Sequence, residues 1–456
     1  MAHKSMRNVL LSLSVAAALG CSASTAFADG DRVEELEARI AELEALVHQL
    51  LGNQQAAAQA PSTAQLEQTA EAAAEEKVNE MIAAHHAEEE AKAKKHSYKF
   101  GGYVKADVIY SDFSGGPVTG IGRDFDIAGT VPDSNVSEFE DVGESYLDLH
   151  ARESRINFKS AHNLDNGAKM TTMIEFDFLA TNDGNERVSN SYSPRMRHAF
   201  FTYNKWLFGQ TWMTFFNVGA LPENLDFVGP AESTIFGRQT MVRYTSGNWQ
   251  FAAENPETTI TPYGGGGRIV ADDSRVPDLV GRYNMKGDWG SFTVAAIARE
   301  LRYENASAGI KDSTSSYGIS LSGKFMVGDR DDFRWMASTG KGLGRYMGLN
   351  TANGAVLDAD GNLQAIDSYG IFGSYRHFWN EKWRSNLTLG YLKVDNETEL
   401  TGTGVTKKAQ SLHVNLIYSP QPKLDFGVEF MYADREVESG ADGDLTRVQF
   451  SGKYAF

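Results

Sequence analysis

The spacing of hydrophobic residues along the chain changes near Tyr98. Downstream, apolar and polar residues alternate, most clearly in Leu424–Tyr432, which predicts β-strands. Upstream, apolar residues recur every 3.5 residues between charged ones, the a/d pattern of a coiled coil. These upstream positions are Val33, Leu36, Ile40, Leu43, Val47 and Leu50. The change of period predicts a helical N-terminal part followed by a β domain.

The connections between the alternating segments have two lengths. Seven tight turns, from His162–Gly167 to Ser419–Pro422, alternate with eight longer polar connections, which run from Phe113–Gly143 to Asp434–Asp444 and include Glu304–Lys311. Alternation of short turns with long loops is typical of transmembrane β-barrels, whose strands place apolar side chains toward lipid and polar ones toward the lumen. The sequence therefore predicts an all-β fold, a 16-stranded antiparallel transmembrane barrel.

The two ends of the chain indicate export to the bacterial outer membrane. Lys4 and Arg7, the apolar run Val9–Leu19 and a small-residue site predict a signal peptide over residues 1–28, cleaved after Ala28. The alternative is a lipoprotein signal with acylated Cys21. At the other end, alternation reaches a C-terminal aromatic, as in bacterial outer-membrane barrels. The alternating residues there are Val448, Phe450, Gly452, Tyr454 and Phe456.

The remaining chain divides into three predicted parts. Residues 29–52 form the coiled coil, with a single amphipathic helix as the alternative, and 53–96 form an Ala/Glu-rich linker or helical tether. Residues 97–456 form the barrel. Because an even number of strands returns the chain to its starting side, both barrel ends and the coiled coil are expected in the periplasm. Peptidoglycan is a possible contact of the coiled coil, and a structural link to the cell wall is one alternative function.

The amino-acid composition argues against several classes of function. The formal net charge is −17, which argues against a nucleic-acid partner, because phosphate binding requires clustered Lys and Arg. A single Cys excludes disulfide frameworks and Cys-based metal sites. The ten His are scattered, and no catalytic set stands out. We therefore predict no enzyme activity, no cofactor and no metal, and keep a barrel enzyme as an alternative.

One long connection differs from the others because it is strongly apolar. Sixteen strands enclose a water-filled channel, which selects nothing unless something narrows it. Residues 214–236 hold many large apolar side chains, so they are expected to fold into the barrel rather than into water. This predicted constriction loop contains Pro222, Glu223, Asp226, Phe227 and Pro230.

Arginines recur at strand positions on successive predicted strands. A charge facing lipid at mid-depth costs roughly 2–4 kcal/mol, so these side chains should line the pore. The predicted pore-lining and solute-binding residues are Arg152, Arg155, Arg195, Arg197, Arg238, Arg243, Arg282 and Arg299. Two interpretations are open. The arginines form a positive ladder that favours small anions, or they are bridges to Asp148, Glu175 and Asp177.

The net charge of the barrel weighs against anion preference without deciding it. The signal peptide carries +2 and residues 29–96 carry −9, which leaves −10 for residues 97–456. Many of these acids lie in long loops, and selectivity follows the field at the constriction rather than the total charge. The sequence predicts a passive outer-membrane porin for small anionic solutes.

Several short motifs carry a resemblance to a known family. They are Ser154-Arg155, Gly209-Gln210 with Trp212 and Phe215, Pro222-Glu223, Leu225-Asp226-Phe227, Gly229-Pro230, Arg238-Gln239 and Arg243-Tyr244. The sequence resembles the DcaP-like family of trimeric bacterial outer-membrane porins. The resemblance implies a homotrimer in contact with outer-membrane lipid and lipopolysaccharide, with uptake of dicarboxylates. The phosphate-selective porins are similar in plan, so a phosphate or polyphosphate channel is the nearest alternative.

Overall fold

The computed structural model describes residues 41–42, 44–45, 77, 80–81, 95–118, 123, 143–181, 184–185 and 187–456. Its chain divides into two units, Met1–Glu89 and Glu90–Phe456. The predicted signal peptide lies outside the described residues, as do most of the predicted coiled coil and tether. The few residues described there are helical. No helix among the described residues is long and apolar enough to span a membrane.

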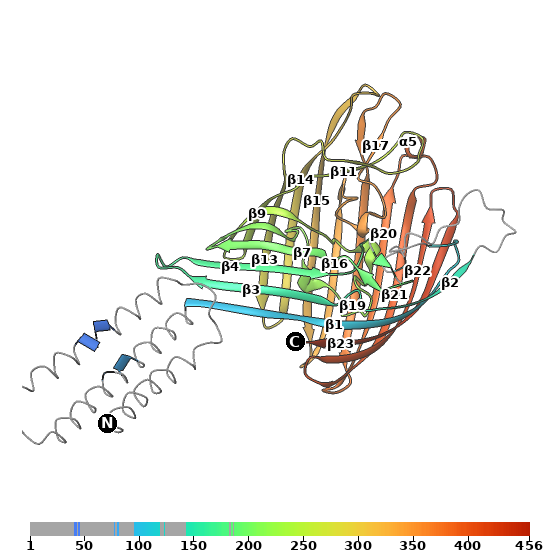
Figure 1. The fold of residues 1–456 in the computed structure, drawn as a ribbon. Helices are drawn as coiled ribbons and strands as arrows, with labels where there is room; N and C mark the ends of the chain where they lie inside the picture. The colour runs from blue at the N-terminus through green and yellow to red at the C-terminus, as the bar shows by residue number, and fades with distance from the viewer. Residues whose placement is uncertain are drawn as a thin grey trace, which may run out of the picture. The chain divides into compact units, whose positions relative to one another are not determined.

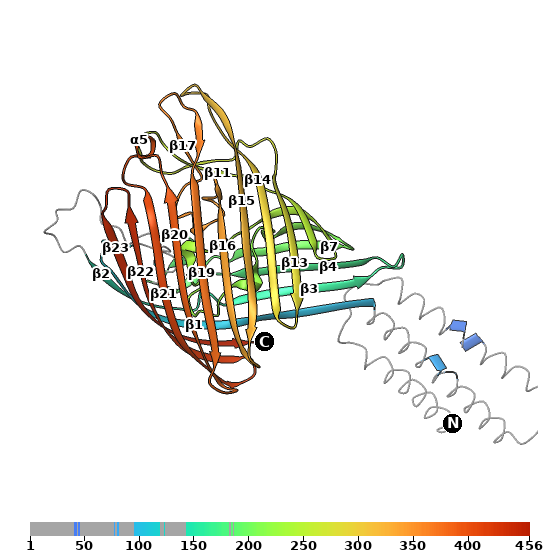
Figure 2. The ribbon, with the colours of Figure 1, turned by 180° about the vertical axis from the view of Figure 1, so that it is seen from behind.

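The second unit is a closed antiparallel barrel (Figures 1 and 2). Strand β1 (His96–Phe113) pairs with the last strand, β23 (Asp442–Ala455), and this pairing closes the sheet. The other edge of β1 pairs with both β2 (Glu144–His150) and β3 (Arg155–Asn163). These two segments are halves of one barrel strand, interrupted at residues 151–154. The seventeen segments of the sheet therefore make sixteen barrel strands, as predicted.

The other barrel strands follow in chain order, each paired with the next. They are β4 (Lys169–Asp177), β7 (Arg195–Tyr203), β8 (Trp206–Trp212), β9 (Arg238–Ser246), β10 (Trp249–Glu254), β13 (Asp278–Gly287), β14 (Gly290–Asn305), β15 (Ile310–Val327), β16 (Asp331–Lys341), β19 (Asp367–Phe378), β20 (Trp383–Asp395), β21 (Thr406–Gln421) and β22 (Leu424–Val437).

The two faces of the barrel wall invert the pattern of a soluble protein. On β21, Val414 and Leu416 are exposed on the outer face, whereas Ser411, His413 and Asn415 are buried on the inner face. Lipid requires this arrangement, because the outer face meets hydrocarbon and the inner face holds the polar groups. The buried polar residues of the barrel strands, such as these three, therefore lie on the inner face of the wall.

The long connections build more structure than the sequence predicted. The sequence predicted a long loop at Glu304–Lys311, and this prediction is wrong. Strands β14 and β15 extend into that range and leave only a four-residue turn at 306–309. Four short strands from two other connections form a separate sheet at the same end of the barrel (Figure 1). They are β11 (Thr258–Thr261), β12 (Ile269–Ala271), β17 (Ala355–Leu357) and β18 (Leu363–Ala365). Leu301 and Tyr303 of β14 pack into the core of this sheet, which explains the length of the hairpin.

Two smaller elements complete this long-loop end. The helix α5 (Thr398–Thr401) lies in the connection between β20 and β21, and its Leu400 carbonyl accepts a hydrogen bond from the Gly264 N–H. The segments β5 (Gly184–Asn185) and β6 (Ser191–Tyr192) form a short ladder between β4 and β7. The opposite end has only tight turns, and we call it the short-turn end.

Candidate functional site

The connection between β8 and β9 lies inside the barrel. Its main-chain carbonyls accept hydrogen bonds from wall side chains on three separate strands. Arg282 of β13 donates to the Phe216 carbonyl at 2.7 Å and Arg334 of β16 to that of Leu221 at 2.6 Å. Lys105 of β1 donates to the Leu225 carbonyl at 2.8 Å. We call residues 214–236 the constriction loop, since these contacts place it within the lumen.

Apolar packing and local capping hold the constriction loop in shape. Phe215, Phe216 and Ile235 are at most 1% exposed, which gives the inward fold its hydrophobic driving force. At the bend, the Asp226 carboxylate accepts hydrogen bonds from the N–H groups of Val228 and Gly229, at 3.0 and 2.9 Å. This is an Asx-type turn. Gly229 has a φ of +81°, a conformation that favours glycine.

The two prolines flank this bend. The Pro230 carbonyl accepts a hydrogen bond from the Thr234 hydroxyl at 2.8 Å, which closes the short helix η4 (Ala231–Ser233). The Pro222 ring lies beside Gly229, because a Cβ at that glycine would stand 3.2 Å from the Pro222 Cγ. Both predicted prolines thus shape the loop, and their side chains carry no polar group.

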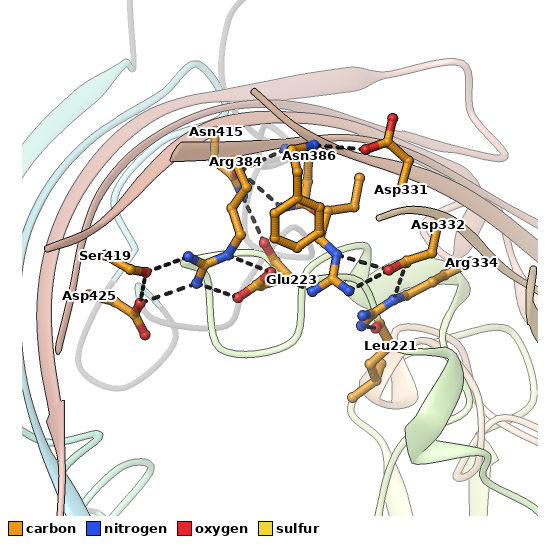
Figure 3. A network of polar contacts seen from close by, with 12 residues as sticks. Leu221, Glu223, Asp331, Asp332, Arg334, Arg384, Asn386, Asn415, Ser419 and Asp425 are labelled. Carbon is orange, nitrogen blue, oxygen red and sulfur yellow. Dashed lines mark hydrogen bonds and ion pairs between the residues drawn. The ribbon is translucent and has the colours of Figure 1, made fainter. Parts of the chain in front are cut away.

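Glu223 joins the loop to the far wall through two arginines (Figure 3). Arg384 donates to both of its carboxylate oxygens, Nε at 3.0 Å and Nη2 at 2.7 Å, and Arg376 Nη1 donates at 2.8 Å. Asp332 accepts from Arg376 and Arg334, and Asp425 accepts from Arg384. Three guanidinium groups face three carboxylates here. We call these six residues the paired group: Glu223, Asp332, Arg334, Arg376, Arg384 and Asp425.

The charge state of Glu223 follows from its partners. Burial acts to raise the pKa of its carboxyl, but the hydrogen bonds and charges of Arg384 and Arg376 outweigh burial and lower the pKa below its ordinary value. Glu223 is therefore ionised at neutral pH. Its side chain is 29% exposed, so the carboxylate is accessible from the lumen.

A second arginine cluster lies on strands β3, β7 and β9. Arg195 donates two hydrogen bonds of 2.8 Å to Asp177. Arg197 donates to Glu175 at 2.8 Å and to Asp177 at 2.7 Å. Arg155 stands 3.5 Å from Glu175. Among the described residues, no carboxylate contacts Arg238. We call the cluster the basic group, because it has four guanidinium groups and two carboxylates: Arg155, Arg195, Arg197, Arg238, Glu175 and Asp177.

Aromatic rings hold the guanidinium groups of this cluster. Arg238 lies 4.6 Å from the ring centre of Trp212 and 5.9 Å from that of Phe236. Phe227 of the constriction loop lies 5.4 Å from the guanidinium of Arg197. Such cation–π contacts orient an arginine without using its N–H donors. Arg238 Nη1 is buried and has no hydrogen-bond partner in the part of the chain that the structure describes.

The structure does not bring the eight predicted pore arginines into one ladder. Arg243 donates weakly to Trp212 and Thr214, and Arg282 to the Phe216 carbonyl, so both support the constriction loop. Arg299 is buried and pairs with Asp278 at 2.9 Å. Arg152 lies in the break between β2 and β3, over the ring of Tyr192. The other four form the basic group.

Sequence reasoning missed the arginines of the paired group. Arg334, Arg376 and Arg384 lie on β16, β19 and β20, and the rule that strand arginines face the lumen would have selected them. The contacts of Arg376 and Arg384 with Glu223 join residues more than 150 positions apart, which no local pattern reveals. The predicted bridges to Glu175 and Asp177 do occur, whereas Asp148 pairs with Arg123 at 2.8 Å.

Buried acids behind the loop fix its position. Glu429 of β22 accepts hydrogen bonds from the N–H groups of Leu225 and Asp226, at 2.8 and 3.2 Å. Glu232 of the loop is 1% exposed and accepts from the Ser411 hydroxyl at 2.9 Å. Burial raises the pKa of its carboxyl. These contacts attach the loop to the wall at Leu225, Asp226 and Glu232.

The lumen groups suit recognition of anions. Guanidinium groups bind carboxylates and phosphates through paired N–H donors in a fixed plane. Within the described ranges, no three His, Cys, Asp or Glu side chains are placed to hold a metal ion. The arrangement can select solutes by charge and shape.

These features define a class, the sixteen-stranded outer-membrane barrels with an inward-folded loop, which is the porin architecture. A family model described as DcaP outer membrane protein matches residues 29–456. The chain belongs to this family. It is therefore an outer-membrane protein.

One solved structure has the same fold, and a second is reported beside it. The outer membrane channel DcaP of Acinetobacter baumannii is 22% identical, with a TM-score of 0.64 over 80% of this chain and 98% of that one. An anion-selective porin from Comamonas acidovorans is 11% identical, with a TM-score of 0.46 over 79% of this chain and 100% of that one. In sequence, no curated protein matches significantly.

Proposed function

We propose that this protein is a passive diffusion channel that prefers small anionic solutes such as dicarboxylates. The observation that carries the proposal is the basic group, in which four guanidinium groups face two carboxylates beside the constriction loop. The Acinetobacter relative is described as a channel, which agrees with passive transport.

Local charge supports anion preference despite the acidic total. The field that an ion meets is set by the charges nearest to it, and water screens distant loop acids over about 8 Å at physiological ionic strength. The paired group adds no net charge, because its carboxylates match its guanidinium groups. The basic group, with four guanidinium groups and two carboxylates, adds a local excess of positive charge beside the constriction loop.

The assembly that we propose is a homotrimer with the short-turn end in the periplasm. The family resemblance supports it, and the N-terminal coiled coil would then bundle on the same side. Cross-linking of the purified protein, followed by mass measurement, tests the number of subunits. A monomer under conditions that keep the barrel folded would contradict the assembly.

The channel proposal is tested by the reversal potential of the purified protein in a planar bilayer under a KCl gradient. We expect a potential on the chloride side. A potential on the potassium side would contradict anion preference, and no conductance from a folded barrel would contradict the channel itself. Block of the current by succinate against block by phosphate then separates a carboxylate channel from a phosphate channel.

A further inference from the structure

The Glu223 carboxylate sits in the bidentate position of Arg384, the geometry in which a guanidinium binds a carboxylate. Three charge-assisted hydrogen bonds of 2.7–3.0 Å surround it, and two of them form the planar fork that Arg384 offers to any carboxylate. The donors come from two arginines on adjacent wall strands. The ligand, however, comes from the constriction loop, as Figure 3 shows for Glu223 and Arg384.

The main chain at Glu223 is held independently of its side chain. The Glu223 carbonyl accepts a hydrogen bond from Asn415 at 2.8 Å, so its main chain is tied to the wall separately. On either side, Arg334 holds the Leu221 carbonyl and Glu429 holds the Leu225 N–H. Rotation of the Glu223 side chain alone would expose the two guanidinium groups.

The other two carboxylates of the paired group cannot exchange in this way. Asp332 is fully buried and is held by both Arg334 and Arg376. Asp425 contacts only one of the two arginines, Arg384 at 3.2 Å, and does not lie between them. Glu223 is thus the one member of the paired group that is both accessible and shared by Arg376 and Arg384.

We propose that Arg376 and Arg384 form a carboxylate-binding subsite on the solute path, and that Glu223 is its built-in competitor. The proposal rests on the proposed channel function. A passing carboxylate takes the two guanidinium groups while Glu223 swings away, and Glu223 returns when the solute leaves. Exchange keeps binding weak, and a channel requires weak binding because a solute that binds tightly blocks the pore.

Substitution of Glu223 tests the competitor role. A subsite that is open for about a tenth of the time binds about tenfold more weakly than one that is always open. Glu223→Gln and Glu223→Ala should therefore lower the succinate concentration that half-blocks the KCl current by about tenfold. The measurement uses the full-length protein in planar bilayers, after a gel-mobility shift on heating has shown that each barrel is folded.

Asp425→Asn is the matched control. It removes one negative charge from the same Arg384, but that carboxylate does not bridge the two arginines. We expect Asp425→Asn to change the half-blocking concentration by less than about twofold, as a general field effect would. Equal changes in Glu223→Gln and Asp425→Asn would overturn the proposal, because charge alone would then explain both. No change in Glu223→Gln and Glu223→Ala would also overturn it.

The same recordings separate this proposal from the proposed function. The wild-type reversal potential, measured without succinate, tests anion preference alone. A potassium-side potential together with a tenfold change in Glu223→Gln would refute anion preference and support the subsite. A chloride-side potential with no change in Glu223→Gln would keep anion preference and refute the subsite.

Discussion

The basic group and the paired group are built from the same types of side chain, but these side chains have different roles. Both hold arginines against carboxylates inside the barrel. In the basic group the acids are wall residues, Glu175 and Asp177, and they are too few to neutralise the arginines. In the paired group one acid, Glu223, comes from the loop, and with it the number of carboxylates equals the number of guanidinium groups. Arginine is therefore a source of field in one place and, through Arg334 and the Leu221 carbonyl, an anchor for the loop in the other.

The two groups also differ in what surrounds their guanidinium groups. Three rings, those of Trp212, Phe227 and Phe236, face guanidinium groups of the basic group. In the described part of the paired group, one ring does so, that of Phe378 at 4.9 Å from Arg376. Aromatic faces orient a cation and leave its N–H donors unused. The donors of the paired group contact protein oxygens, whereas Arg238 Nη1 of the basic group has no hydrogen-bond partner among the described residues.

The largest effect expected is loss of stability when Arg197 is replaced. Its side chain is 1% exposed and pairs with the buried Glu175 and Asp177, so Arg197→Met leaves two carboxylates buried with one fewer partner. Breaking a buried ion pair on one side costs about 3–5 kcal/mol. The free energy of unfolding from urea titration in detergent measures the loss. Arg195→Met is the control, with a smaller loss because Arg195 is 22% exposed, and equal losses would contradict our account of burial.

The next effect concerns ion selectivity and compares the two groups directly. A unit charge about 8 Å from the ion path changes the relative permeability of chloride and potassium roughly two- to fivefold. Arg238→Gln should lower anion preference by this factor. The double variant Arg376→Gln with Glu223→Gln removes a neutral pair and should leave the reversal potential close to wild type. A larger shift in the double variant than in Arg238→Gln would contradict the assignment of field to the basic group.

The sequence was sufficient to predict the sixteen-stranded barrel and insufficient to predict the grouping of charges. Each barrel strand must alternate lipid-facing and lumen-facing side chains, so the strand count could be read from Leu424–Tyr432 and similar segments. The break at residues 151–154 was missed, because a turn from Ala151 to Ser154 interrupts the strand without ending it. Which acid meets which arginine depends on how the strands curve and where the loop crosses them. Local periodicity does not contain that information.

The contact between loop and wall gives a third prediction, of intermediate size. Gly390 of β20 lies against the loop, and a Cβ there would stand 2.0 Å from Glu232 Oε1 and 2.7 Å from Pro230 Cβ. Gly390→Ala should push the constriction loop away from this wall and change the single-channel conductance. Gly281→Ala is the control, since its Cβ would meet only Phe251 at the ordinary distance of 3.8 Å. Unchanged conductance in Gly390→Ala would show that the loop does not set the width of the pore.

The smallest effect expected concerns Glu232 and pH. Burial raises the pKa of this loop carboxyl, so the folded state favours the protonated form. A group with a raised pKa lowers stability at high pH, and the penalty disappears as the pH falls through the folded pKa. Glu232→Gln should therefore raise the unfolding temperature at neutral pH and converge with wild type in acid. Because Ser411 donates to the carboxylate, the gain is modest, and a loss of stability at neutral pH would mean that this hydrogen bond outweighs burial.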